Sequence, residues 1–275
     1  MYRIVADSSC DFSSYPEIDF RSVPLTLSTA EREFTDDCNL NVRDMMDYMT
    51  SYKGRCQTAC PSVESWLEAF EGAQELYVLT ITSGLSGTYN SACLAANQFL
   101  EDHPDVKVRV FDTKSTGPEM RLLMEKIVEL KSQGKSFTEV CKEADAYLST
   151  TRLFFSFQSL HNLAQNGRVN KVLASALGML HISILGTATP EGVIEPIGKS
   201  RGENALIRSF VKEIEKAGYQ GGKVRICHAD NEALAQNVTS ALREKYPNLD
   251  AFIYPAGGLC SFYVENGGII LGCEC

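Results

Sequence analysis

Two features are scarce in this sequence: basic residues and long apolar runs. The 26 Lys and Arg are outnumbered by 35 Asp and Glu, so the net charge is -9. A surface that follows nucleic-acid phosphates needs Lys and Arg gathered on one face, and no such cluster is visible. A membrane helix needs about 18 to 20 apolar residues in succession. The nearest run, 172–185, is interrupted by Ser175, His181 and Ser183. We therefore expect neither a nucleic-acid partner nor a membrane span.

Signals for export are also absent from the start of the sequence. A strand-like segment, Tyr2–Ala6, begins almost at Met1 and leaves no room for a basic region followed by an apolar signal segment. Ten cysteines in a chain of 275 residues are then better explained as reduced, mostly buried thiols than as a disulfide framework. These observations predict a cytoplasmic protein.

The sequence lacks the usual nucleotide-binding and metal-binding motifs. Neither a P-loop nor a G-x-G-x-x-G segment occurs, so a nucleotide cofactor is not expected. The cysteine pairs at 56/60 and 273/275 have C-x3-C and C-x-C spacings rather than the C-x2-C of zinc sites, and they lie far apart in the chain. We expect no cofactor and no metal.

The chain is long and rich in apolar residues, and its two halves differ in the order of their predicted strands and helices. Hydrophobic residues make up 44% of the chain, which suits two domains of ordinary size. The first half alternates β-rich segments with helical ones, which predicts a doubly wound, mainly parallel sheet. These segments are the strands Tyr2–Ala6, Leu76–Ile81 and Val106–Phe111 and the helices Val63–Glu71, Gly87–Glu101 and Met120–Gln133.

Beyond about residue 150 the pattern changes to neighbouring strands. The segments His181–Ala188 and Val193–Ile197 are separated only by the turn 189–192, so they must pair antiparallel. Further strands are expected at Leu153–Phe157, Lys223–His228, Ala251–Tyr254 and Ile269–Gly272, with helices at Glu203–Ala217 and Glu232–Lys245. The fold class is therefore α/β, with an N-terminal domain at 1–152 and a C-terminal α+β domain at 153–275 whose sheet is largely antiparallel. A cleft between the two is a favoured ligand position.

The most informative segment joins the strand at Leu76–Ile81 to the following helix. It reads Thr82-Ser-Gly-Leu-Ser-Gly-Thr88, so its backbone N–H groups, the helix dipole and the hydroxyls of Ser83 and Ser86 could all face one anion. Simple capping of the helix explains the segment equally well. A hydrolase nucleophile elbow would need Gly-x-Ser-x-Gly, but Thr88 replaces the final glycine. None of the four histidines carries a signature that would pair it with Ser86.

Three other segments are weaker candidates. In Cys56-Gln-Thr-Ala-Cys-Pro-Ser62 the hydroxyl of Thr58 is free, although a loop closed by a capping serine is a sufficient explanation. Asp7 follows the first strand and could orient loops, meet a ligand or form an Asx-turn. Arg168 follows a helix that ends at Gly167 and could face an anion.

Taken together and in order, these segments resemble the DegV family of fatty-acid-binding proteins over most of the chain. The segments that carry the resemblance are Asp7-Ser-Ser-Cys-Asp11, Val23-Pro-Leu25 with Phe34-Thr-Asp36, Thr58-Ala-Cys-Pro-Ser62, Ser83-Gly-Leu-Ser-Gly-Thr-Tyr89, Phe111-Asp-Thr113 with Ser115 and Gly117, and Asn166-Gly-Arg168. The resemblance implies a protein without catalytic residues that carries a long-chain fatty acid. It also implies a carboxylate held by Thr58, Ser86 and the Gly87 N–H, and presentation of the acid to a separate fatty acid kinase.

The same resemblance implies a wider head-group region and an apolar tunnel. Ser83, Arg168 and Tyr263 are the candidates for the head-group region. For the tunnel we expect apolar side chains of the second half, with Phe154, Phe155, Leu160 and Ile184 as candidates. A serine-dependent acyl hydrolase and a ligand-free interaction module of the same fold are the alternatives.

The chain departs from the family pattern near the expected head group. Cys60 stands in a loop that usually reads Thr-Ser-Gln-Pro, and Ser183-Ile184 replaces a usual Lys-Pro. Tyr263 lies where a histidine is expected before a Gly-Pro-Gly turn, which here reads Glu265-Asn-Gly-Gly268. If that histidine assists phosphoryl transfer, the departure bears on transfer rather than on lipid binding.

Overall fold

The computed structural model describes residues 2–16, 18–169 and 182–275, and its first half is built on a parallel sheet. This sheet, sheet A, has the strand order β2-β1-β6-β7, and all neighbours are parallel. Its strands are β1 (Tyr2–Asp7), β2 (Asp19–Val23), β6 (Glu75–Thr80) and β7 (Lys107–Asp112). A short 3-10 helix, η1 (Ser8–Cys10), follows β1 directly.

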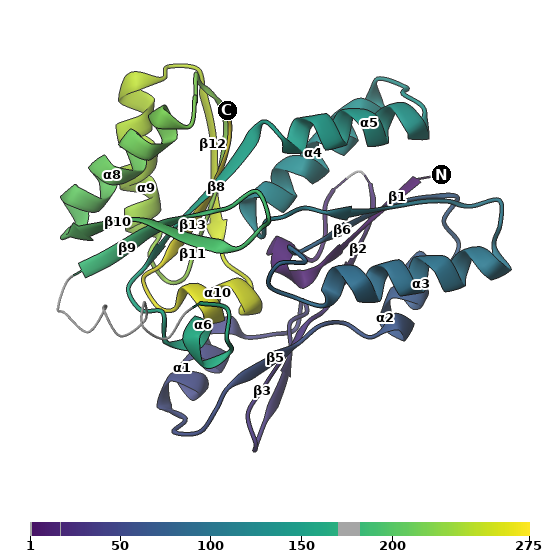
Figure 1. Ribbon diagram of the computed structural model, residues 1–275, viewed down its shortest axis with the longest axis horizontal. Helices are drawn as coiled ribbons and strands as arrows, with labels where there is room; N and C mark the ends of the chain where they lie inside the picture. Colours follow the sequence, from purple (N-terminus) through teal and green to yellow (C-terminus); the bar gives the residue numbers. More distant parts are fainter. Residues whose placement is uncertain (1, 17, 170–181) are drawn as a thin grey trace.

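Helices cover both faces of sheet A because its strands are apolar on both sides (Figure 1). Along β6, Tyr77 and Leu79 face α4 (Pro118–Ser132) and α5 (Phe137–Leu148). Leu76 and Val78 face α2 (Val63–Phe70) and α3 (Thr88–Asp102). The predicted doubly wound arrangement is confirmed, and each predicted strand and helix of this half is found within two residues of its expected bounds.

A small antiparallel sheet, sheet B, was not predicted. It has the order β4-β3-β5 and packs with α1 (Val42–Ser51) below sheet A in Figure 1. Its strands are β3 (Thr26–Ser28), β4 (Glu33–Thr35) and β5 (Gln57–Ala59). Strands of three residues give too short an alternation to be distinguished from loops in the sequence.

The second half forms a six-stranded sheet, sheet C, with the order β10-β9-β8-β13-β11-β12. Only the β11–β12 pair is parallel, so the predicted largely antiparallel sheet is confirmed. Its strands are β8 (Thr151–Phe157), β9 (Ile182–Ala188), β10 (Ile194–Arg201), β11 (Gly222–His228), β12 (Leu249–Pro255) and β13 (Ile269–Glu274). The predicted start of β9 at His181 lies outside the described residues.

The two faces of sheet C are covered differently. The helices α8 (Glu203–Lys216) and α9 (Glu232–Lys245) pack on one face around Phe210, Val238 and Leu271. The other face turns toward sheet A and carries the short helices α6 (His161–Gln165) and α10 (Gly258–Val264). Figure 1 shows this face meeting the loops of sheet A near the centre of the molecule. The division at 152/153 stays a prediction; it falls within β8, the first strand of sheet C.

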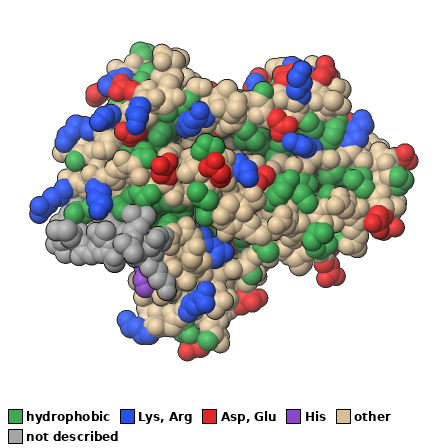
Figure 2. Space-filling view, viewed as in Figure 1, with side chains coloured by type: hydrophobic (Ala, Val, Ile, Leu, Met, Phe, Trp, Pro, Cys, Tyr) green, Lys and Arg blue, Asp and Glu red, His purple; other side chains and the backbone are tan. Residues whose placement is uncertain are grey.

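Charge is distributed without segregation on the visible surface. Figure 2 shows Lys and Arg interspersed with Asp and Glu on one face of the molecule. Among the described residues, no helix is both long enough and apolar enough to cross a bilayer.

Candidate functional site

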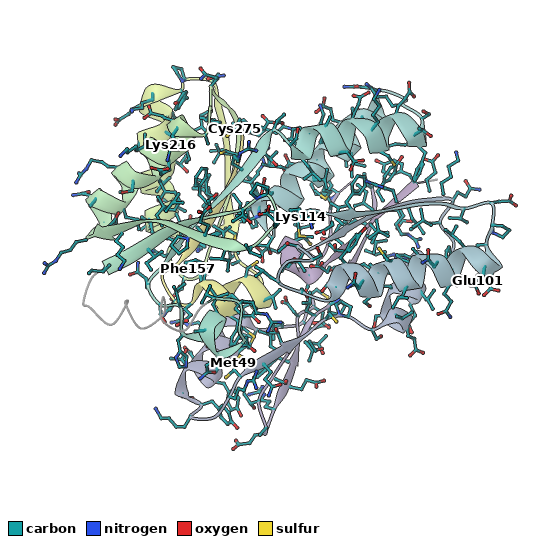
Figure 3. The ribbon with its side chains drawn as sticks, in the orientation of Figure 1. Met49, Glu101, Lys114, Phe157, Lys216 and Cys275 are labelled. Carbon is teal, nitrogen blue, oxygen red and sulfur yellow. The ribbon has the colours of Figure 1, made fainter. Side chains whose placement is uncertain are left out.

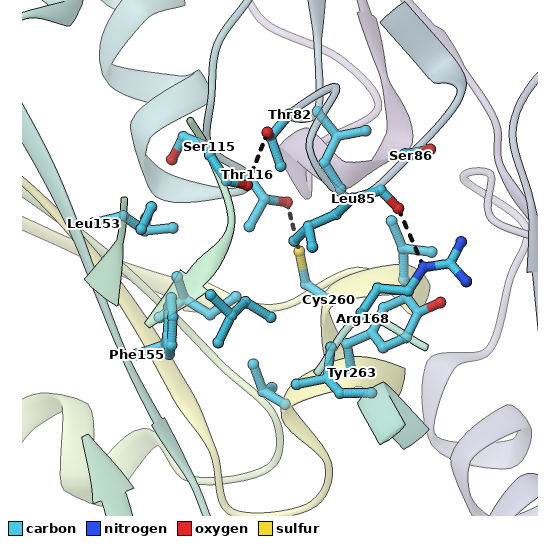
Figure 4. Close-up of a pocket in the computed structure, with 18 of the residues that line it drawn as sticks. Thr82, Leu85, Ser86, Ser115, Thr116, Leu153, Phe155, Arg168, Cys260 and Tyr263 are labelled. Carbon is cyan, nitrogen blue, oxygen red and sulfur yellow. Dashed lines mark hydrogen bonds between the residues drawn. The ribbon is translucent and has the colours of Figure 1, made fainter. Parts of the chain in front are cut away.

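A pocket lies between the carboxyl-end loops of sheet A and the inner face of sheet C (Figure 4). The space between its walls, open solvent included, amounts to about 760 Å³. The loop between β6 and α3 and the loop between β7 and α4 form one wall. The strands β8 and β13, the turn between β9 and β10, and the helices α6 and α10 form the others.

The wall formed by sheet C is apolar. Leu153, Phe155 and Phe157 alternate along β8, so all three side chains point to the pocket face. Leu163, Leu259, Val264 and Ile270 extend this surface. Of the four residues predicted to line a tunnel, Phe155 alone lines this pocket. Phe154 lies one residue along the strand and packs with the helices on the opposite face, while Leu160 and Ile184 belong to the core beneath the pocket without lining it.

At the polar end of the pocket, two hydroxyl groups from distant parts of the chain meet. The Oγ1 of Thr58, on β5, lies 2.7 Å from the phenolic oxygen of Tyr263, on α10. Burial raises the pKa of Tyr263, although its contact with Thr58 and the charge of Arg168 act in the opposite direction. The phenol therefore stays protonated at neutral pH and can donate a hydrogen bond.

Ser86 lies at the start of α3, on the same side of the pocket. The loop around it is a tight turn in which the N–H groups of Leu85 and Ser86 both donate to the carbonyl of Thr82. The hydroxyl of Ser86 lies 2.8 Å from that of Thr88 and accepts the Thr88 N–H at 3.3 Å. Among the described residues the N–H of Gly87 has no hydrogen-bond acceptor. The amino end of α3 thus offers a hydroxyl and a free N–H, in the field of the helix dipole, to an anion.

Arg168 brings a positive charge to the same end. Its Nε donates to the carbonyl of Leu85 at 3.1 Å (Figure 4). Its Nη1 donates to the carbonyl of Asn166. No carboxylate among the described residues forms an ion pair with it. The turn that presents it needs glycine at position 167, whose φ is +72°. A partly buried guanidinium whose partners in the described part of the chain are carbonyl groups is suited to a bound anion.

The other predicted head-group residues lie slightly apart. Thr58, Ser86, Arg168 and Tyr263 line the pocket, but Ser83 and Gly87 do not. The Ser83 hydroxyl accepts a hydrogen bond from Lys114 at 3.0 Å, and its N–H donates to Asp112. Lys114 also forms an ion pair with Asp112, so Ser83, Asp112 and Lys114 have one another as polar partners. Figure 3 shows Lys114 near the centre of the molecule, where the two halves meet.

Three buried aspartates hold the polar end in place, a role that the sequence suggested only for Asp7. Asp7 accepts the N–H groups of Ile81 and Ser9, which fixes the loop after β6. Asp36 accepts the N–H groups of Gly258 and Leu259 at 2.8 and 3.0 Å, and Asp11 accepts that of Gly257 at 2.9 Å. Both therefore fix the start of α10, the helix that carries Tyr263. Burial raises the pKa of all three, to about 6 for Asp7 and about 7 for Asp11.

Among residues 2–16, 18–169 and 182–275, no histidine is paired with Ser86 as a serine hydrolase would require. In the described part of the chain, the hydroxyl of Ser86 has Thr88 as its neighbour and contacts no histidine. His161 bonds to Gln165, and Nδ1 of His228 is buried without a partner. The described residues also contain no group of three His, Cys, Asp or Glu side chains that could hold a metal ion.

Comparisons with known proteins agree with this architecture. The model of the DegV family, described as uncharacterised proteins, matches residues 1–272. A DegV domain-containing protein of Streptococcus pneumoniae is 41% identical over 277 residues, with 99% of both chains covered. The chain belongs to the DegV family.

Solved DegV structures share the whole fold. A DegV family protein from Eubacterium eligens, loaded with heptadecanoic acid, superimposes with a TM-score of 0.98 at 51% identity, covering 100% of this chain and 99% of that one. The fatty acid kinase B3 protein of Streptococcus pneumoniae, loaded with linoleic acid, superimposes with a TM-score of 0.97 at 41% identity, covering 99% of each chain. The α/β fold class of this DegV chain, with its parallel and largely antiparallel sheets, is thereby confirmed.

Proposed function

We propose that this protein binds a long-chain fatty acid in the pocket between sheets A and C. The observation that carries the proposal is the pocket itself, with an apolar wall from β8 and a polar end where Thr58, Ser86, Arg168 and Tyr263 meet. An amphiphile with one anionic end matches both surfaces at once. The fatty acids in the related structures from Eubacterium eligens and Streptococcus pneumoniae support the same ligand class.

The carboxylate is assigned to the polar end. One oxygen would accept hydrogen bonds from Thr58 and Tyr263 and the other from Ser86, with Arg168 supplying the opposite charge. The Gly87 N–H, which lies next to Ser86 but outside the lining residues, is proposed as a further donor at the edge of the pocket. A tail of about 14 buried methylenes contributes roughly 11 kcal/mol gross, before ordering costs, at about 0.8 kcal/mol each. Each head-group contact contributes about 1 to 3 kcal/mol. The tail therefore dominates affinity, and the head-group contacts fix orientation and select acids over neutral lipids.

We further propose that the chain is a carrier and not an enzyme, and that it presents the acid to a separate fatty acid kinase. The absence of a histidine beside Ser86 in the described residues argues against ester hydrolysis. The similarity to the kinase-associated B3 protein favours a kinase partner. A carrier that serves a kinase must keep the head group near the surface, and the pocket is partly open to solvent.

A cytoplasmic location is part of the proposal. All ten cysteines are free, which suits a reducing compartment. The division into domains at 1–152 and 153–275 is also proposed, with the carboxylate-binding loops in the first and most of the apolar wall in the second.

Binding is tested with matched ligands and variants. Palmitic acid and hexadecanol have the same tail and differ in the head group. The double variant Thr58→Ala with Ser86→Ala should bind the acid at least about tenfold more weakly while changing the affinity for the alcohol little. The control pair Thr35→Ala with Ser132→Ala alters two exposed hydroxyls and should leave both affinities unchanged. Equal losses for acid and alcohol would show that no carboxylate site exists.

The carrier role has its own experiment. Acyl phosphate formation is measured with ATP, the loaded protein and a purified fatty acid kinase, and then with each protein alone. The expected result is product only when both proteins are present. Product from this chain alone, or ester hydrolysis that disappears in Ser86→Ala, would instead identify an enzyme.

A further inference from the structure

One pair of cysteines has no part in the pocket. Cys273 and Cys275 lie at the end of β13, and their Sγ atoms are 3.6 Å apart. Figure 3 shows Cys275 at the end of sheet C opposite to Phe157, which lines the pocket. The spacing of two residues places both side chains on the same face of an extended strand.

The neighbourhood holds the two residues in this arrangement. Cys273 is fully buried and pairs in register with Val224 on one side and Arg152 on the other. The N–H of Cys275 donates to the carbonyl of Thr150 at 2.5 Å. Between them, Glu274 points to the opposite face, where it accepts the Tyr147 hydroxyl at 2.7 Å and the Lys223 N–H at 2.9 Å. The segment is fixed on both sides by the rest of sheet C.

The two sulfurs are near enough to form a disulfide once the backbone at Cys275 shifts. Residues two apart in a strand have Cα atoms about 6.7 Å apart, near the upper end of the range of about 4.4 to 6.8 Å found in disulfides. Side chains two apart in a strand stand parallel, so rotation of the side chains alone does not close the gap between the sulfurs. Cys275 follows the last residue of β13, and closure requires it to leave the extended conformation and give up its hydrogen bond to Thr150. A bridge at the limit of the geometric range is more easily reduced than an unstrained one, which favours reversibility over a permanent cross-link.

The two thiols differ in a way that assigns roles. Cys275 is partly exposed, while Cys273 is out of contact with solvent. The pKa of Cys275 is lowered, chiefly because the Cys273 thiol donates to it and also because of the charge of Arg152, whereas the pKa of Cys273 is raised by the same contact and by burial. Cys275 is therefore the accessible, more nucleophilic sulfur, and Cys273 is the buried neighbour in reach of it.

We propose that Cys273 and Cys275 form a reversible dithiol–disulfide site that reacts with small disulfides such as oxidised glutathione. The Cys275 thiolate attacks one sulfur of the oxidant, forming a mixed disulfide and releasing one glutathione thiolate. Cys273 then gives up its proton and attacks the Sγ of Cys275, releasing the second glutathione. Two protein thiols are oxidised, one small disulfide is reduced to two thiols, and the two protons pass to those thiols.

The experiment uses the full chain in buffers of defined ratios of oxidised to reduced glutathione. Free thiols are blocked with N-ethylmaleimide, and the protein is cleaved with chymotrypsin. Cleavage after Tyr263 leaves Val264–Cys275, in which Cys273 and Cys275 are the only cysteines, so its mass reports this pair alone. With oxidant in excess, we expect at least about half of this peptide to carry no N-ethylmaleimide and to be two hydrogens lighter than the unblocked dithiol peptide. Dithiothreitol should reverse this change.

Two variants separate the roles of the sulfurs. In Cys273→Ser, the glutathione adduct on Cys275 should accumulate because no neighbour resolves it. In Cys275→Ser, Cys273 should remain unmodified because it is buried. Cys38→Ser removes an exposed cysteine elsewhere and should leave the peptide's behaviour unchanged.

The proposal is overturned if both cysteines take up N-ethylmaleimide at every glutathione ratio. It is equally overturned if the adduct forms on Cys273 in preference to Cys275. Should Cys273→Ser fail to fold by circular dichroism, the wild-type mass change and the Cys275→Ala variant still decide the question. Fatty-acid binding is not part of the readout, so this result is independent of the proposed function.

Discussion

The hydroxyl groups of Thr58 and Tyr263 are 2.7 Å apart, although 205 positions separate the two residues in the chain. One comes from a three-residue strand of sheet B and the other from a short helix that packs on sheet C. Their contact closes the polar end of the pocket from two sides. A ligand carboxylate at this point would meet two donors whose positions depend on the packing of both halves of the molecule.

The phenol of Tyr263 is expected to contribute to binding of acids. Tyr263→Phe keeps the ring in the pocket and removes only the hydroxyl, so one charge-assisted hydrogen bond is lost. We predict a loss of about tenfold in affinity for palmitic acid and a smaller one for hexadecanol, measured by titration calorimetry. Tyr48→Phe is the control, because its hydroxyl contacts Thr29 away from the pocket. An unchanged affinity in Tyr263→Phe would place the carboxylate elsewhere.

The charge of Arg168 is expected to act on the ligand rather than on the fold. Arg168→Met keeps an apolar stem of similar length and removes the cation. Because Arg168 has no carboxylate partner among the described residues, we predict a change in unfolding free energy of less than about 1 kcal/mol. The affinity for the acid should fall about tenfold or more. Arg109→Met removes an exposed arginine paired with Asp145 and should not alter binding. A large stability loss with unchanged binding would contradict the prediction.

Gly84 lies where the β6–α3 loop packs closely against the β9–β10 turn, so a substitution there tests how much the turn depends on this contact. A Cβ atom there would lie 2.8 Å from the carbonyl of Glu191 and 3.0 Å from that of Gly192, both backbone atoms. Gly84→Ala should therefore push the turn away and lower the unfolding free energy by about 1 to 3 kcal/mol. Since Val193 and Ile194 of this region line the pocket, release of a fluorescent fatty acid should also be faster in stopped-flow measurements.

The matched control is Gly198→Ala, at a position with open space and no positive φ. It should change neither stability nor release by a measurable amount. If Gly84→Ala behaves in the same way, the turn does not depend on this contact.

Asp11 is expected to make stability depend on pH. Burial raises its pKa from 3.8 to about 7, so the folded protein holds this proton more tightly than the unfolded chain does. Between pH 3.8 and about 7 the folded state binds more protons, and the free energy of unfolding therefore falls as pH rises through this window and levels off above it. The contribution of this group reaches up to about 4 kcal/mol.

Asp11→Asn removes the titration while keeping an oxygen for the Gly257 N–H. Asparagine also tolerates the left-handed backbone at this position, where φ is +66°. The variant should be more stable than the wild type at pH 8, and the difference should shrink toward pH 4, measured by urea denaturation. Asp37→Asn, an exposed neighbour of Asp36, should follow the wild-type pH profile. A constant difference between Asp11→Asn and the wild type across this range would rule out the titration.

Much of the fold was predictable because it follows from local patterns. Buried strands such as β6 and amphipathic helices such as α9 carry apolar residues at their own periods, so their bounds could be predicted to within one or two residues. Sheet B, β2, α1, α5 and α10 were missed. The strands of sheet B are only three residues long, and the burial of Leu27 or Phe262 depends on neighbours far away in the chain.

For the candidate site, local sequence patterns indicated the polar residues but not the apolar wall. The Ser-Gly turn at Ser86 and the arginine after Gly167 mark a candidate anion site locally, because helix starts and glycine turns have recognisable residues. The apolar wall was predicted poorly: the alternation along β8 shows that Phe154 and Phe155 face opposite sides, but not which side is the pocket.

The sequence alone therefore determined the elements, the alternation that builds a parallel sheet, and the residues capable of holding an anion. Those properties reside in backbone propensities and in side chains close together in the chain. Only the tertiary structure decided that Thr58 meets Tyr263, that β8 turns Phe155 toward the pocket, and that Asp11 and Asp36 hold the start of α10. Such contacts join segments up to 246 residues apart, and their geometry follows from how sheets A, B and C pack on one another.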